Sequence, residues 1–229
     1  MKTLAKSAIV RAVEIYAQNG VSVELFKLGP LRTNVGLISK DQQAIIVDAP
    51  PDSADFLTQY LQEKHLDPTA LLITHHHWDH ISDAHIWHNQ NVSIYAQKHD
   101  ATEIEHPDNR LLATYADVTV IPCPVDHILQ DGDTFSLLGL TIQMLWIPGH
   151  VQGGAAYFFK DLQLCFVGDT LFAHSVGRSD LPGGDKHVLF RSIREKLYTL
   201  PDEAMVIPGH GHTTTIGYEK TTNPFVRPN

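Results

Sequence analysis

Cysteine, clustered positive charge and long apolar runs are all scarce in this chain. Two cysteines, Cys123 and Cys165, occur in 229 residues, which argues against a disulfide framework and favours a reducing, cytoplasmic location. No apolar segment approaches the roughly 20 residues that a membrane helix needs, so no membrane contact is expected. The formal net charge of −9 and the lack of a basic run argue against a nucleic-acid surface, because phosphate binding needs clustered Lys and Arg.

Linkers rich in Gly and Ser, and repeats of short period, are also lacking. A chain of this length fits one large domain better than two. Residues 2–18 carry scattered basic and apolar residues and end at Asn19-Gly20, a pattern typical of a weakly amphipathic helix. We therefore predict an N-terminal helical extension at 1–20 and a single domain at 21–229. The extension has no long apolar core like that of a secretory signal, so we interpret it as a packing or contact element.

Apolar runs separated by turn residues predict alternating strands and helices. Strands are predicted at 21–28, 34–39, 43–48, 70–74, 92–95, 134–138, 140–147, 154–159, 162–167 and 204–207. Helices are predicted at 52–64, capped by Asp52 or Ser53, at 82–90 and at 186–199. Residues 97–127 are mixed, with a helical pattern at 97–105, and the tail after 207 is irregular. Two strand-rich halves that each add helices indicate a layered α/β sandwich with one continuous core.

Histidine, by contrast, is abundant, with 15 residues. The most informative stretch is 74–80, Thr-His-His-His-Trp-Asp-His, which directly follows the apolar run 70–73. Two histidines two residues apart arise easily by chance in such a chain, but four ligand-type residues at fixed positions after a strand do not. Imidazole and carboxylate groups bind zinc and also suit iron or manganese. His75 and His77 can face one point and Asp79 and His80 a second, so one cluster could serve two metal ions.

Three further segments repeat the order of apolar strand, turn and ligand-type residue. The strand at 140–147 leads to His150, that at 162–167 to Asp169, and that at 204–207 to His210. A glycine precedes each of these residues and permits a tight turn. Taken alone, such a residue is more often structural than a ligand. If the strand ends converge, the chain supplies seven ligands, enough for two metal ions bridged by one carboxylate: His75, His77, Asp79, His80, His150, Asp169 and His210.

These motifs resemble the metallo-β-lactamase fold superfamily. The stretches 168–172, 177–185, 208–211, 217–220 and 223–225 more narrowly resemble the short, single-domain bacterial relatives of glyoxalase II (hydroxyacylglutathione hydrolase). The resemblance implies a four-layer αββα sandwich. It also implies two divalent metal ions, zinc with iron or manganese as alternatives. One ion would be held by His75, His77 and His150, the other by Asp79, His80 and His210, with Asp169 bridging them. His76 occupies a variable position and is not counted as a ligand.

The implied reaction is hydrolysis of a small-molecule thioester by a hydroxide that bridges the two ions. Asp79 is the expected catalytic residue, because its carboxylate could orient the nucleophile. Arg178 either binds a substrate carboxylate or forms a salt bridge that braces the loop at 177–180. His212 stands where full-length glyoxalase II has a tyrosine, and the chain ends before that enzyme's glutathione-binding helical domain, so glutathione specificity is left open.

Several alternatives to thioester hydrolysis stay open. The main one is a persulfide dioxygenase with a single iron held by two His and one Asp, although the stretch 181–184 favours the hydrolase branch. Lactone hydrolysis would use the same chemistry. A β-lactamase is disfavoured because many zinc β-lactamases place Cys at the position of Asp169, and a flavodiiron reductase because it tends to carry Glu at that of His77. From another class, the domain could be a metal-bound, non-catalytic interaction module. The sequence leaves the oligomeric state open.

Overall fold

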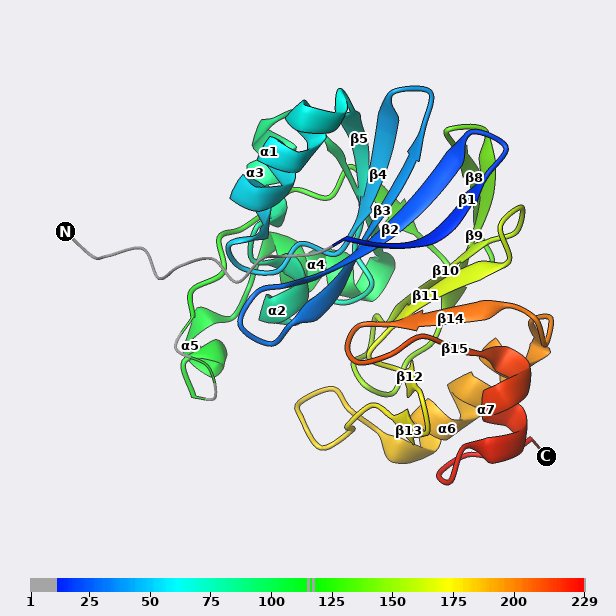
Figure 1. The fold of residues 1–229 in the computed structure, drawn as a ribbon. Helices are drawn as coiled ribbons and strands as arrows, with labels where there is room; N and C mark the ends of the chain where they lie inside the picture. The colour runs from blue at the N-terminus through cyan, green and yellow to red at the C-terminus, as the bar shows by residue number, and fades with distance from the viewer. Residues whose placement is uncertain (1–11, 115, 117, 229) are drawn as a thin grey trace.

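Two β-sheets lie against each other and helices cover the outer side of each, as Figure 1 shows for the computed structural model. The structure describes residues 12–114, 116 and 118–228. Within them, one sheet has seven strands in the order β1-β2-β3-β4-β5-β6-β7, and the other has six in the order β15-β14-β11-β10-β9-β8. The predicted four-layer αββα sandwich is confirmed.

The first sheet is built from the N-terminal half of the chain. Its strands are β1 (Val13–Gln18), β2 (Val21–Leu28), β3 (Thr33–Lys40), β4 (Gln43–Val47), β5 (Asp67–Leu72), β6 (Ser93–Gln97) and β7 (His127–Leu129). The helices of this half are α1 (Ser53–Lys64), α2 (Trp78–Ile81), α3 (Ala84–Asn89), α4 (Lys98–Glu105) and α5 (Asn109–Leu112). The helical pattern predicted at 97–105 is therefore confirmed as α4.

The second sheet is built from the C-terminal half. Its strands are β8 (Thr134–Leu137), β9 (Leu140–Trp146), β10 (Ala155–Phe159), β11 (Leu164–Gly168), β14 (Met205–Pro208) and β15 (Thr214–Thr215), and a small hairpin joins β12 (Leu171–Phe172) to β13 (Ser175–Val176). Helices α6 (Lys186–Glu195) and α7 (Ile216–Thr222) lie beside this sheet, with a 3-10 turn at Leu197–Thr199. Each predicted strand occurs, with ends within three residues of those expected.

Three clusters of buried apolar residues fill the three spaces between the four layers. Strand β10 shows how the sequence divides between them: Tyr157 and Phe159 join the cluster between the sheets, whereas Phe158 joins the cluster that includes residues of α6. Side chains alternate across a strand, so a strand covered on both sides must be apolar at every position. This burial on both faces explains why the central strands are continuous apolar runs in the sequence.

Between the two sheets, Gly36 on β3 meets Phe166 on β11. A Cβ atom built on Gly36 would lie 2.4 Å from the Phe166 ring. The absence of a side chain at Gly36 therefore makes room for the aromatic ring, and the ring fills the space between the sheets.

The helix predicted at 2–18 is wrong over residues 13–18, which form the edge strand β1, and residues 2–11 lie outside the described residues. Strand β1 pairs antiparallel with β2 from Gln18 opposite Val21. Asn19 and Gly20 both have positive φ, 54° and 75°, which is the geometry of a two-residue hairpin turn. The Asn-Gly pair is thus a hairpin turn and not a helix end.

Two smaller expectations need correction. Asp52 occupies the N-cap position of α1, as predicted, but its side chain makes no capping hydrogen bond. The carboxylate of Asp83 instead accepts a hydrogen bond from the Ala54 amide at 2.8 Å. The tail after 207 is not irregular, because it contains α7.

Cys123 and Cys165 are both buried and free. In the part of the chain that the structure describes, no helix combines the length and apolarity required to span a bilayer.

Candidate metal centre

The ends of four strands, drawn from both sheets, carry the predicted ligands to one place. His75 and His77 follow β5, and Asp79 and His80 lie on the short helix α2 beyond them. His150 follows β9, while Asp169 and His210 follow the neighbouring parallel strands β11 and β14. Carboxyl ends of parallel strands meet at the same edge of a sheet, where sites are commonly built. The structure brings all seven predicted residues together.

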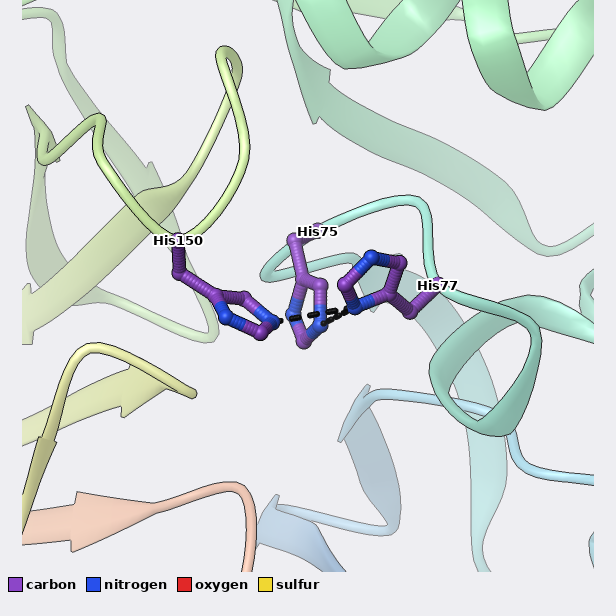
Figure 2. A group of neighbouring side chains, drawn as sticks. All are labelled: His75, His77 and His150. Atoms are coloured by element: carbon purple, nitrogen blue, oxygen red, sulfur yellow. Dashed lines mark hydrogen bonds between the residues drawn. The ribbon is translucent and has the colours of Figure 1, made fainter. Parts of the chain in front are cut away.

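His75, His77 and His150 form one group of converging rings, shown in Figure 2. The Nδ1 atom of His77 lies 3.2 Å from Nε2 of His75 and 2.9 Å from Nε2 of His150. The three rings are almost edge to face, with centroids 4.6–4.9 Å apart. Each ring therefore directs one nitrogen at the same point.

Asp79, His80 and His210 form a second group, and Asp169 lies between the two groups. Nε2 of His210 is 3.1 Å from Oδ2 of Asp79, and Nε2 of His80 is 3.6 Å from the same oxygen. Asp169 Oδ1 is 3.6 Å from His80 Nε2, while its Oδ2 is 3.5 Å from His210 Nε2 and 3.9 Å from His150 Nε2. A carboxylate in this position faces both groups.

Hydrogen bonds outside the cluster define which nitrogen of each ring faces inward. Nδ1 of His80 donates to Asp48 Oδ2 at 2.8 Å. Nδ1 of His75 donates to the Thr74 hydroxyl, which itself donates to Asp48. Nδ1 of His150 donates to a backbone carbonyl at position 178, and Nδ1 of His210 to one at position 31. With Nδ1 engaged outside the cluster, all four rings turn Nε2 toward the centre, as metal-binding histidines do.

The electrostatics of the two groups differ. Burial lowers the pKa of His75 well below its usual range and that of His77 to about 2, so both rings are neutral lone-pair donors. Burial also opposes a charge on His80, but the carboxylates of Asp48 and Asp79 outweigh it and raise the pKa of His80 to about 10. Burial raises the pKa of Asp79, yet His80 and His210 hold it below its usual range. The second group therefore favours positive charge.

Divalent metal ions fit this arrangement. His80 Nε2 and Asp169 Oδ1 are buried without a hydrogen-bond partner, which is costly unless another group satisfies them. The inward nitrogens of His75 and His150 both lie within 3.2 Å of Nδ1 of His77, so one shared cation could accept lone pairs from all three rings. Gly209 leaves room for the Asp169 carboxylate, since a Cβ there would lie 2.2 Å from Asp169 Oδ1. Histidine nitrogens with carboxylate oxygens suit zinc, iron or manganese.

Two residues near the cluster turn away from it. The side chain of His76 lies 3.0 Å from Asp100 and takes no part in either group of ligands. Arg178 is exposed and forms a two-pronged ion pair with Asp180, with both N–O distances at 2.8 Å. Of the two roles considered for Arg178 from the sequence, the salt bridge within the loop at 177–180 is therefore present. Binding of a substrate carboxylate by Arg178 stays a prediction.

Sequence reasoning assigned no role to Asp48, although the structure makes it the common acceptor behind two candidate ligands. Its carboxylate accepts from His80 Nδ1, from the Thr74 amide and from the Thr74 hydroxyl. The sequence does contain a pattern that points to Asp48. It directly follows the buried strand β4, just as several of the candidate ligands follow the ends of their strands.

Comparison with known proteins places this geometry in a family. The model of the metallo-beta-lactamase superfamily matches residues 28–210. The probable metallo-hydrolase YqgX of Bacillus subtilis is 32% identical over 200 residues, covering 87% of this chain and 94% of that protein. The hydroxyacylglutathione hydrolase GloC of Haemophilus influenzae is 32% identical over 209 residues, covering 90% of this chain and 98% of that protein.

Solved structures agree with the sequence relatives. The B3 metallo-beta-lactamase BLEG-1 superposes with a TM-score of 0.83 at 32% identity, over 89% of this chain and 99% of that one. TTHA1623, solved in a di-iron-bound form, superposes with a TM-score of 0.76 at 37% identity, covering 87% of this chain and 98% of that one. The chain therefore belongs to the metallo-beta-lactamase superfamily and is one of its metallo-hydrolases.

Proposed function

We propose that this protein hydrolyses small-molecule thioesters, of the hydroxyacylglutathione type, with two metal ions. The observation that carries the proposal is the convergence of seven candidate ligands into two adjoining groups that share Asp169. The relative GloC, which carries the name hydroxyacylglutathione hydrolase and aligns over nearly its whole length, supports the choice of substrate class. The di-iron-bound relative supports a binuclear site.

The seven candidate ligands would hold two metal ions, which supply the chemistry of hydrolysis. His75, His77 and His150 would hold one ion, Asp79, His80 and His210 the other, and Asp169 both. When bound, such ions lower the pKa of water and stabilise the oxyanion that develops on an acyl group. The water oxygen bonds to the acyl carbon, the carbon–sulfur bond breaks, and the thiolate leaves and takes up a proton.

Asp79 is suited to orient the attacking water. Its carboxylate is ionised, since the neighbouring histidines hold its pKa below the usual range, and an ionised carboxylate only accepts hydrogen bonds. It lies beside both His80 and His210 at the centre of the second group. A water that donates to Asp79 would be held close to the bridging position of Asp169.

One competing activity has a specific observation in its favour. BLEG-1, which is 32% identical to this chain, is named as a B3 metallo-beta-lactamase. Hydrolysis of β-lactams is therefore the second candidate activity. Persulfide oxidation, the alternative raised by the sequence, needs one iron and oxygen, whereas the geometry here offers two adjoining groups of ligands.

Parallel assays with oxygen monitoring separate these activities. We expect release of free thiol from S-lactoylglutathione without oxygen uptake and only slow turnover of the β-lactam nitrocefin. Asp169→Asn should lower thiol release by more than about 100-fold, because it removes the shared ligand. Asp67→Asn, an exposed carboxylate at the opposite end of β5 from the ligands, serves as control. Oxygen uptake with glutathione persulfide, faster turnover of nitrocefin, or an Asp169→Asn variant with wild-type activity would each contradict the proposal.

A further inference from the structure

A second concave region lies beside the His150 loop and is not used by the metal centre. It is a cavity of about 600 Å³, within the size range of small-molecule sites. The loop between β9 and β10 forms one wall and α6 forms the other. Its lining includes Trp146 and Gln152 on the first wall, Arg191, Glu195 and Lys196 on the second, and His99 beside them.

This cavity adjoins a smaller one that reaches the candidate ligands. The smaller cavity measures about 230 Å³ and is lined by His77, one of the three histidines of the first group. His99, Gln152 and Gly183 line both cavities. A molecule whose reacting carbon lies at the metal centre could therefore extend past His77 into the larger cavity.

The larger cavity presents one unpaired charge of each sign. Arg191 and Glu195 are exposed, stand four residues apart on α6, and make no side-chain hydrogen bond or ion pair with other described residues. Positions four apart lie on the same helix face. The remaining charges are already engaged: Lys196 pairs with Asp131 at 2.6 Å, and Asp185 caps the start of α6.

An aromatic pair forms the apolar part of the lining. The Trp146 ring is half-buried and stacks on His99 at a centroid distance of 5.5 Å. Its Nε1 donates to the Gln152 carbonyl at 2.8 Å, which fixes the ring's orientation. Such a surface suits an uncharged stem between two charged ends.

We propose that this cavity binds the thiol half of the substrate and that this half carries both a carboxylate and an ammonium group. The inference rests on the proposed thioester hydrolysis. Arg191 would pair with the carboxylate and Glu195 with the ammonium, while the stem lies on Trp146. A polyphosphate carrier fits poorly, because the three carboxylates of the lining, Asp131, Asp185 and Glu195, outnumber its two cations.

Binding can be measured without turnover. S-methylglutathione, which carries carboxylate and ammonium groups but no thioester to cleave, should change the fluorescence of Trp146 in a saturable way, and Trp146→Phe should lose that signal. Arg191→Gln should weaken binding about tenfold or more, through loss of a charged hydrogen bond. Lys186→Gln, which removes the same charge from α6 outside the cavity, should bind like wild type. Absence of saturable binding, or equal affinity in Arg191→Gln, would overturn the proposal.

Kinetics then distinguish this proposal from the proposed function. Arg191→Gln should raise KM for S-lactoylglutathione with little change in kcat, the signature of lost uniform binding. The neutral thioester S-lactoyl-N-acetylcysteamine should be cleaved equally well by wild type and variant. If both thioesters are cleaved but Arg191→Gln affects them alike, the cavity assignment is wrong and the hydrolase stands. If S-methylglutathione binds through Arg191 but neither thioester is cleaved, the proposed function is wrong and the binding site stands.

Discussion

At the scale of single residues, the metal centre depends as much on hydrogen bonds behind the ligands as on the ligands themselves. Asp48 is the clearest case, because one buried carboxylate orients His80 directly and His75 through Thr74. Its backbone adopts a left-handed conformation with φ of 64°, which Asp and Asn tolerate better than other side chains. One residue thus links the first group of ligands to the second.

Asp48→Asn tests this role with little change of size or backbone preference. The amide keeps one acceptor oxygen but replaces the other with a donor, so one of the bonds from His80 and Thr74 must be lost. We expect metal affinity to fall about 10- to 100-fold, measured by competition with a chromophoric chelator.

Asp41 provides a matched control, since it is exposed and also left-handed, with φ of 49°. Asp41→Asn should bind metal like wild type. An Asp48→Asn variant that keeps wild-type affinity would show that Asp48 does not tune the ligands.

At the scale of elements, the sequence predicts what depends on local pattern and on burial. Central strands are identified by their continuous apolar runs, and each predicted ligand lies where such a run ends. Edge strand β1 is missed because most of its residues are exposed and their spacing also fits a helix. Helix α7 is missed because it is short and contains Gly217 and two threonines, which are weak helix formers. It is stabilised by packing that sequence reasoning does not reveal, since Ile216 and Glu219 are fully buried.

The cap of α7 can be tested separately from that packing. The Thr215 hydroxyl accepts a hydrogen bond from the Tyr218 amide at 3.2 Å, so Thr215→Ala should lower the free energy of unfolding by about 1 kcal/mol. Thr221→Ala, at an exposed position in the last turn of the same helix, should be neutral or slightly stabilising, because alanine favours a helix. Urea denaturation measures both. Equal effects of the two substitutions would contradict the assignment of Thr215 as the cap.

At the scale of the whole molecule, the metal centre joins the two halves of the sandwich. His75 and His77 extend from the first sheet, whereas His150, Asp169 and His210 extend from the second. Ions bound between them would hold together two sheets that otherwise contact each other through apolar packing such as that of Gly36 with Phe166. Metal binding should therefore stabilise the entire fold.

Removal of metal with a chelator should accordingly lower Tm. A ligand present at about 100 times its Kd stabilises the native state by about 2.7 kcal/mol, which for a chain of this size corresponds to roughly 5–10 °C. Differential scanning calorimetry with and without EDTA measures the shift. Asp169→Asn should show a smaller shift, and an unchanged wild-type Tm would exclude a structural contribution of the metal.

Titration of metal into the metal-free protein tests the two-metal hydrolase most directly. Thiol release from S-lactoylglutathione, measured in the absence of oxygen, should rise until about two equivalents of Zn²⁺, Fe²⁺ or Mn²⁺ are bound per chain and then remain constant. A rate that reaches its maximum at one equivalent, or that appears only when oxygen is supplied, would contradict hydrolysis at a binuclear centre.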